Sequence, residues 1–220
     1  MKPQVDKNHY EFSHYVGFDR WASYHKQIKE TLVLQPESIL EVGLGDGVYR
    51  NYLLSQTNIR YQSLDIDPEL KPDIVGSVTA IPLLDSAVDY VVAFEILEHL
   101  PFEQFSTALQ EIARVAKRGA IISLPHFGPP VKLSFKLPFL PEISLAFKIP
   151  YMPQHRFNGQ HYWELGKKGY SVARILREFE RYFIVEKHFV PFENQYHHFF
   201  VLTKHSPDTK NKAKKYKVEP

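Results

Sequence analysis

Short apolar runs alternate with stretches of helical periodicity along most of the chain. Strands are predicted at 38–42, 60–66, 72–75, 88–94 and 120–124, helices at 20–34, 48–55, 102–117 and 172–182, and a closing strand pair at 183–190 and 196–204. Gly119 is interpreted as the stop signal between the helix at 102–117 and the strand that follows. Strand–helix alternation of this kind is typical of a parallel sheet with helices on both faces, so the expected fold class is α/β.

A proline-rich segment interrupts this alternation. Seven prolines fall between residues 125 and 153, and apolar residues there occupy odd-numbered positions, at Val131, Leu133, Phe135, Leu137, Phe139, Ile143, Leu145, Phe147, Ile149 and Tyr151. Period 2 predicts extended chain, but the prolines exclude a central strand. Burial of apolar surface is worth about 25 cal/mol per Å², so these side chains are expected to bury against the body, a partner or lipid.

Three interpretations of the insertion stay open. It forms a lid that walls an apolar acceptor pocket, or a peripheral membrane contact through 131–151 assisted by Lys132, Lys136 and Lys148, or a packed subdomain or dimer contact. The domain organisation predicted is a single domain over 1–205, with a cap helix at about 18–34 and the insertion at 125–160. A polar, Lys-rich tail follows at 206–220.

Composition narrows the class of protein. The 220 residues, 44% of them hydrophobic, suffice for one substantial core. The absence of cysteine excludes disulfides, thiolate metal sites and cysteine nucleophiles. A formal net charge of +2 gives no strong field for nucleic acid. Because no apolar run approaches the ~20 residues of a membrane span, and the first residues lack a secretory signal, a cytoplasmic location is the default expectation.

Three glycines stand at alternate positions between the first predicted strand and its helix. Gly43, Gly45 and Gly47 allow a tight turn and close approach of a ligand at the carboxyl edge of the sheet, although a plain strand-to-helix turn is the alternative. Asp65 ends the second strand about 20 residues later, where a carboxylate accepts hydrogen bonds from ribose hydroxyls. Val48 breaks the dinucleotide pattern and no Walker lysine follows. A nucleoside binder that does not grip a pyrophosphate is indicated.

Three stretches together carry a resemblance. "EVGLGDG" at 41–47, "LDID" at 64–67 and "GSVTAIPLLDSAVDYVVAFEILEHLP" at 76–101 resemble the class I S-adenosylmethionine-dependent methyltransferases, of the small-molecule type close to methyltransferase domain 11. The resemblance implies a Rossmann-like, mostly parallel seven-stranded sheet with an antiparallel C-terminal strand pair. It also implies S-adenosylmethionine as cofactor and S-adenosylhomocysteine as product.

The resemblance assigns roles along the carboxyl edge of the sheet. Residues implied in cofactor binding are Glu41, which orients the loop, Gly43, Leu44 and Gly45 around the methionine end, Asp65 on the ribose, Ile66 beside the adenine, and Phe94 and Glu95 at the exit of the fourth strand. The usual Gly-Asp-Ala after the third strand is here Gly76-Ser77-Val78. The serine hydroxyl is shorter than a carboxylate and uncharged, which points to backbone groups for adenine recognition.

Methyl transfer needs an acceptor atom held ~3 Å from the methyl group and, for a protonated acceptor, a base. His99 and His126 are candidate catalytic bases at strand exits, with structural roles in turns as the alternative. Candidates for acceptor contacts are Trp21, His155, Arg156 and His161, which otherwise pack the cap helix or anchor the insertion. No residue spacing suggests a zinc or iron site, so we expect no metal.

The expected function is methyl transfer from S-adenosylmethionine to the O, N or C atom of a small, partly apolar acceptor. A protein or other macromolecule methyltransferase and a non-catalytic cofactor-binding scaffold are the alternatives. Adenine methylation of nucleic acid is disfavoured because no Asn/Asp-Pro-Pro-aromatic stretch follows the fourth strand, and cytosine C5 attack would need a cysteine. An oligomer is compatible with the sequence.

Overall fold

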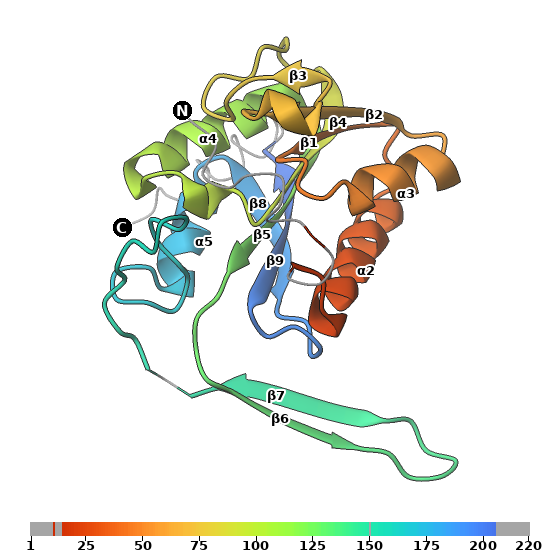
Figure 1. Cartoon of the computed structure of the whole chain (residues 1–220), viewed down its shortest axis with the longest axis vertical. Coiled ribbons are helices and arrows are strands. Elements are labelled where there is room, and N and C mark those ends of the chain that lie inside the picture. Colours follow the sequence, from red (N-terminus) through yellow and green to blue (C-terminus); the bar gives the residue numbers. More distant parts are fainter. Residues whose placement is uncertain (1–10, 12–14, 150, 206–220) are drawn as a thin grey trace, which may run out of the picture.

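Seven strands form one sheet in the order β3-β2-β1-β4-β5-β9-β8 (Figure 1). The structure is a computed structural model that describes residues 11, 15–149 and 151–205. The strands are β1 (Ser38–Val42), β2 (Arg60–Asp65), β3 (Ile74–Val75), β4 (Val88–Phe94), β5 (Ala116–Pro125), β8 (Phe183–Phe189) and β9 (His197–Lys204). Strands β1 to β5 pair in parallel, and β9 runs antiparallel to both β5 and β8. This confirms the expected α/β class and the antiparallel C-terminal pair.

Helices cover both faces of the sheet. Helices α2 (Phe18–Val33) and α3 (Val48–Gln56) lie on one side, and α4 (Phe102–Val115) and α5 (Val172–Glu180) on the other (Figure 1). Two short 3₁₀ turns, η2 (Pro68–Leu70) and η3 (Leu97–His99), follow β2 and β4. The central strands β1 and β4 are buried almost throughout, because helices on both faces exclude water and favour continuous apolar runs.

The boundary between α4 and β5 differs from the prediction. The helix ends at Val115 and β5 starts at Ala116, so Gly119 lies inside the strand and is not a helix stop. Gly119 pairs with Tyr90 on one side and Thr203 on the other. A Cβ at this position would lie 2.0 Å from the carbonyl oxygen of Leu202. The glycine is therefore explained by close backbone packing in the sheet.

The proline-rich segment forms a separate two-stranded hairpin. Strand β6 (Pro130–Phe135) pairs antiparallel with β7 (Ile143–Lys148), which agrees with the extended chain predicted from period 2. The cross-strand pairs Val131–Phe147, Leu133–Leu145 and Phe135–Ile143 place the odd-numbered apolar residues on one face. The hairpin projects beyond the carboxyl end of β5 and stands away from the sheet (Figure 1). It does not cover the carboxyl edge, in contrast to the expected lid.

Two other expectations concern the C-terminal tail and membrane-spanning helices. The tail predicted at 206–220 lies outside the described residues, and the division into a domain over 1–205 stays a prediction. Among the described residues, the structure has no helix that is both long and apolar enough to cross a membrane.

Candidate active site

The glycine loop joins β1 to α3 at the carboxyl edge of the sheet. Gly43, Gly45 and Gly47 have φ angles of 82°, 55° and 75°, in the left-handed region that favours glycine. The Gly43 N–H donates to the carbonyl of Leu64 at 2.8 Å. A Cβ on Gly43 would lie 2.0 Å from Cδ1 of Ile96, so the bare backbone lets the loop pack against the exit of β4.

Asp65 ties the end of β2 to this loop. One carboxylate oxygen accepts the N–H of Leu44 at 2.8 Å, and the other accepts the N–H of Asp67 at 2.9 Å. Burial raises the pKa of the Asp65 carboxyl. Ile66 follows as a half-buried side chain. The loops after β1 and β2 are thus held together by one carboxylate.

The base of the loop is fixed by two further acids. Glu41 is buried in β1, where it accepts a short hydrogen bond from the Tyr61 hydroxyl, and burial raises its pKa to about 8. Asp46 accepts a short hydrogen bond from the hydroxyl of Tyr24 in α2. Trp21 packs edge to face on Tyr24 and is 48% exposed, so it lies on the rim of the cap helix and not in the core.

A cavity of about 610 Å³ borders the glycine loop. It is lined by Glu11, residues 44–47, Arg50, Asn51 and residues 69–71. In the loop after β3, the Ser77 hydroxyl lies 2.8 Å from that of Thr79, and Val78 is buried in the core. One loop with three left-handed glycines, the carboxylate at the end of β2 and the adjacent free volume fit a nucleoside whose hydroxyls need an acceptor.

A second group of polar side chains follows β4. Glu95, at φ 56°, and Glu98, in η3, are buried carboxyls: within the described part of the chain, Oε1 of Glu95 and both oxygens of Glu98 have no hydrogen-bond partner. Glu98 Oε1 lies 4.0 Å from Nε2 of His99 and 3.9 Å from Nε2 of His161, and Glu95 Oε2 lies 3.8 Å from Nε2 of His197. Burial raises the pKa of both carboxyls, and the charge of Glu95 raises that of Glu98 further.

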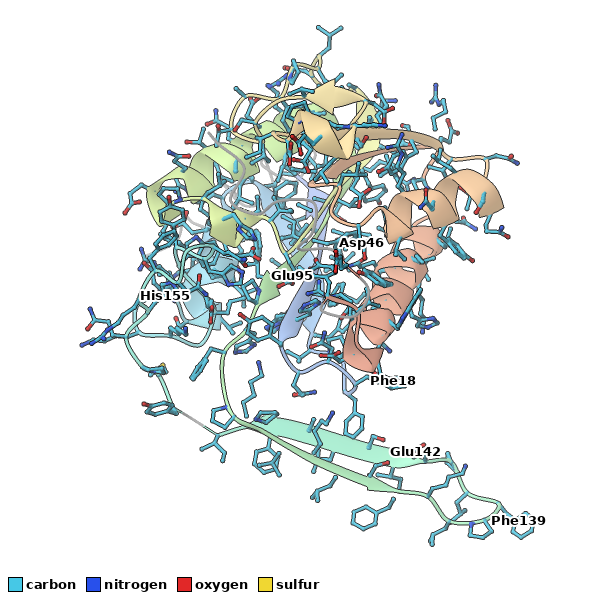
Figure 2. The ribbon with its side chains drawn as sticks, in the orientation of Figure 1. Phe18, Asp46, Glu95, Phe139, Glu142 and His155 are labelled. Atoms are coloured by element: carbon cyan, nitrogen blue, oxygen red, sulfur yellow. The ribbon has the colours of Figure 1, made fainter. Side chains whose placement is uncertain are left out.

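The two groups adjoin. Burial raises the pKa of the Tyr15 hydroxyl to about 12; Arg20 opposes this shift, whereas the charges of Asp46, Glu95 and Glu98 add to it. Tyr15 is therefore within electrostatic reach of both the glycine loop and the acids after β4. Ile96, the residue after Glu95, lies against Gly43, so the glycine loop borders the segment that carries these acids; Asp46 and Glu95 are labelled in Figure 2.

His161 reaches this group from a distant part of the sequence. The N–H of Tyr162 donates to the carbonyl of Glu98 at 2.9 Å, and the indole N–H of the buried Trp163 donates to the carbonyl of Leu100 at 3.1 Å. These bonds pin the segment after the hairpin onto η3. His155 belongs to the same region, with Nε2 2.9 Å from the carbonyl oxygen of His161.

His126 belongs to a group of three histidines at the end of β5. His126 Nδ1 lies 2.9 Å from Nδ1 of His198, whose Nε2 lies 2.9 Å from Nδ1 of His188, so three histidines connect β8 and β9 to the end of β5. Burial lowers the pKa of His126 to about 4. This arrangement favours a structural role over the expected catalytic base. Arg156 is exposed.

Glu164 is the polar side chain in this region that the sequence reasoning missed. Its Oε1 accepts from Nδ1 of His161 at 3.1 Å, and its Oε2 lies 3.0 Å from Nζ of Lys167. The only sequence signal was its position three residues after His161. This spacing brings side chains together in a helix but indicates no contact in an irregular segment. His197 was likewise not identified from sequence, and β9 turns it toward Glu95, with Nε2 3.8 Å from Glu95 Oε2.

Comparisons with known proteins agree with this geometry. A family model described as a methyltransferase domain matches residues 40–124. The fold is shared with the N-methyltransferase NodS from Bradyrhizobium japonicum WM9, solved with S-adenosyl-l-homocysteine (TM-score 0.60, 8% identity, 92% of this chain and 95% of that chain). It is also shared with 1,6-didemethyltoxoflavin-N1-methyltransferase from Burkholderia thailandensis, solved with 1,6-didemethyltoxoflavin and S-adenosylhomocysteine (TM-score 0.56, 15% identity, 86% and 78%). No curated protein matches the chain.

The sheet order, the left-handed glycine loop and the matched domain define a nucleoside-binding α/β transferase. At such low identities the structural likeness shows the fold, and the family match covers residues 40–124. These residues form a methyltransferase domain within a fold shared with S-adenosylmethionine-dependent methyltransferases, which supports S-adenosylmethionine as the cofactor.

Proposed function

We propose that this protein methylates a small acceptor, which binds where the acids and histidines after β4 meet the glycine loop. The single observation that carries the proposal is this juxtaposition at the carboxyl edge of the sheet, where parallel α/β proteins bind ligands. The cofactor supplies an electrophilic methyl group on a sulfonium. The protein then has to position the acceptor atom, exclude water and accept a proton where the acceptor carries one.

We propose cofactor contacts along the exits of β1 to β4. Asp65 offers carboxylate oxygens to the ribose and holds Leu44, while the glycine loop shapes the approach to the methionine end. The full set proposed is Glu41, Gly43, Leu44, Gly45, Asp65, Ile66, Ser77, Val78, Phe94 and Glu95. Because the Ser77 hydroxyl is engaged with Thr79, adenine recognition at this position is assigned to backbone groups.

We assign the acceptor to the cluster of Glu95, Glu98, His99, His161 and His197. His99 keeps its proposed role as a proton acceptor, since it lies beside two buried carboxyls, whereas His126 is bonded elsewhere. Among the described residues, Oε1 of Glu95 and both oxygens of Glu98 accept no hydrogen bond, which favours an acceptor that brings a hydrogen-bond donor or a positive charge, such as a hydroxyl or an amine. The Burkholderia thailandensis N1-methyltransferase that shares the fold was solved with the small molecule 1,6-didemethyltoxoflavin, which supports a small acceptor here. His155 and Trp21 are proposed as its outer wall.

The test begins with the cofactor product. S-Adenosylhomocysteine titrated into the purified chain should bind at one site by calorimetry, and labelled S-adenosylmethionine offered with a panel of small amines and phenols should transfer its methyl group. Glu186→Gln, a change on the exposed side of β8, serves as the control. Absence of product binding would contradict the proposal, and methylation of proteins alone would support the macromolecular alternative.

We also propose that the hairpin β6–β7 contacts an anionic lipid surface. Its apolar face and tip are exposed, with Phe135 at 65% and Phe139 fully so, and Lys132 and Lys136 extend from the other face. An apolar tip flanked by lysines suits the boundary between lipid headgroups and chains. Lys132 and Lys136 donate to the carbonyls of Glu193 and Leu140 but are exposed. Lys148 is half-buried with its ammonium on the carbonyl of His126, so it is not assigned to the lipid contact.

A further inference from the structure

The carboxylate of Glu98 requires a partner that the described residues do not supply. The side chain is fully buried at the start of η3, and neither of its oxygens has a hydrogen-bond partner in the described part of the chain. An ionised carboxylate without a partner is strongly unfavourable in the protein interior. Either a proton or a cation must therefore compensate it.

Two imidazoles face the same carboxylate. Nε2 of His99 and Nε2 of His161 lie 4.0 Å and 3.9 Å from Glu98 Oε1, and one ligand atom from each of the three residues lies within 4.8 Å of the others. Around a metal with bond lengths near 2.0–2.1 Å, tetrahedral ligand atoms lie roughly 3.4 Å apart. Small side-chain rotations would bring these atoms to that spacing.

The orientation of His161 is prepared for such a ligand role. Glu164 accepts the hydrogen bond from Nδ1 of His161 at 3.1 Å, so the Nε2 atom carries the lone pair that points toward Glu98. Lys167 holds the far oxygen of Glu164 at 3.0 Å. A carboxylate bonded to the outer nitrogen of a histidine is the usual support of a metal-bound imidazole. The backbone bond from Tyr162 to Glu98 keeps the two ligand-bearing segments together.

We propose that Glu98, His99 and His161 bind a divalent transition-metal ion. Two imidazoles and one carboxylate suit Zn²⁺ or Mn²⁺ better than Ca²⁺, which prefers oxygen ligands alone. This differs from the expectation of no metal, which rested on sequence spacing. Glu98 and His99 are adjacent, and His161 lies far along the chain, so only the fold brings them together.

The site would also narrow the class of acceptor, a step that rests on the function proposed above. Three protein ligands leave a coordination position open, as in catalytic metal sites. A hydroxyl or similar protic group bound there releases its proton to solvent more readily, because the cation stabilises the anion, and His99 then acts as a ligand in place of its role as proton acceptor. The acceptor class indicated is therefore a hydroxylated small molecule that can ligate a metal, such as a phenol or catechol.

Metal binding can be tested without cofactor or acceptor. The untagged full chain is treated with a chelator, exchanged into buffer and titrated with ZnCl₂ and, separately, MnCl₂ by calorimetry, and its Tm is measured with and without each metal. We expect one site for at least one metal and a higher Tm on binding. Glu98→Gln and His161→Gln should each weaken binding at least tenfold, whereas His25→Gln, an exposed histidine of α2, should not.

The thermal stability of the Glu98→Gln variant is measured as well, to show whether weak metal binding results from misfolding. Because it removes a buried charge, the metal-free variant should be at least as heat-stable as the metal-free parent. No binding of either metal by the chelator-treated parent, or unchanged binding in Glu98→Gln and His161→Gln, would overturn the proposal. S-Adenosylhomocysteine is titrated into the same samples: loss of its binding with metal binding intact counts against the proposed function and leaves the metal site standing.

Discussion

At the scale of single residues, Asp65 combines a structural and a binding role. Its carboxylate already accepts two backbone N–H groups, from Leu44 and Asp67, and it is proposed to accept ribose hydroxyls through its remaining lone pairs. A carboxylate used in this way both positions the glycine loop and binds the ligand. Its replacement should therefore affect the loop as well as the ligand.

Asp65→Ala should weaken S-adenosylhomocysteine binding by about 1–3 kcal/mol, since both the loop N–H and the ribose lose an acceptor. Calorimetric titration measures the change. Asp65→Asn, which keeps one acceptor oxygen, should lie between parent and Ala variant, and Asp85→Ala, an exposed surface carboxylate, is the control. Equal affinity in parent and Asp65→Ala would remove Asp65 from the site.

Glu41 gives a prediction about pH. Its folded pKa of about 8 is raised above the usual 4.5, mainly by burial, so the folded chain holds a proton that the unfolded chain releases between these values. Folding then binds a proton in this window, and the contribution of Glu41 to stability falls as the pH rises from about 4.5 to 8.

Glu41→Gln removes this titration and keeps an acceptor for the Tyr61 hydroxyl. Thermal unfolding of ligand-free protein should show a Tm difference, variant minus parent, that is larger at pH 8 than at pH 5, by a few degrees or more. Comparing the two proteins at each pH cancels other titrating groups. A difference that is constant or that shrinks toward pH 8 would show that Glu41 is ionised in the folded state.

At the scale of elements, tertiary packing determines where β5 begins and where the hairpin β6–β7 lies. The sequence indicates a strand near 120–124, but β5 begins at Ala116 and places Gly119 against the backbone of β9. The hairpin follows its sequence pattern closely, with the odd-numbered apolar residues on one face, yet that face is not packed against the sheet.

Gly119→Ala should destabilise the protein by about 2–4 kcal/mol, because its Cβ meets the Leu202 carbonyl at 2.0 Å and neither strand can move without breaking the ladder. Urea unfolding measures the effect. Gly76→Ala should cost less than half as much, because its Cβ meets side-chain atoms alone, Leu64 Cδ1 at 3.3 Å and Pro82 Cδ at 3.5 Å. Similar costs at the two positions would argue against the close strand packing.

Because of the hairpin, we expect the protein to bind anionic vesicles, and we expect added salt to weaken this binding. Phe139→Ser at the exposed tip and Lys136→Glu on the polar face should each reduce co-sedimentation several-fold, and neither should change S-adenosylhomocysteine affinity. Light scattering without lipid tests the alternative, in which a second copy of the chain covers the apolar face of the hairpin. A dimer that Phe135→Ser dissociates, with no vesicle binding by the parent, would assign this face to a second copy of the chain.

At the scale of the whole molecule, the site is assembled from three distant parts of the chain. The glycine loop and the acids lie at the carboxyl edge of the sheet, and Tyr24 of α2 contacts the loop. The segment after the hairpin places His161 beside η3. The buried Trp163, packed on Phe102 and Phe105, anchors that return. The insertion is therefore fixed to the body at both of its ends, and its middle projects (Figure 2).

The sequence by itself determined the order of elements, the α/β class and a nucleoside-binding edge of the sheet, and the resemblance of residues 41–101 to methyltransferases added the cofactor. The first three follow from local signals: apolar runs such as 88–94, alternating glycines at 43–47, and Asp65 at a strand end. Each signal spans few residues and is therefore readable without knowledge of the fold. The amphipathic pattern of the hairpin was readable for the same reason.

Only the tertiary structure decided which polar residues share a site. From sequence His126 was a candidate base and His161 a candidate acceptor contact, but the sheet register places His126 beside His198, and the Tyr162–Glu98 bond places His161 beside Glu98. Proximity between residues far apart in sequence depends on strand order and on loop anchoring, which no local pattern encodes. The burial that leaves Glu98 without a partner is likewise a property of the packed molecule.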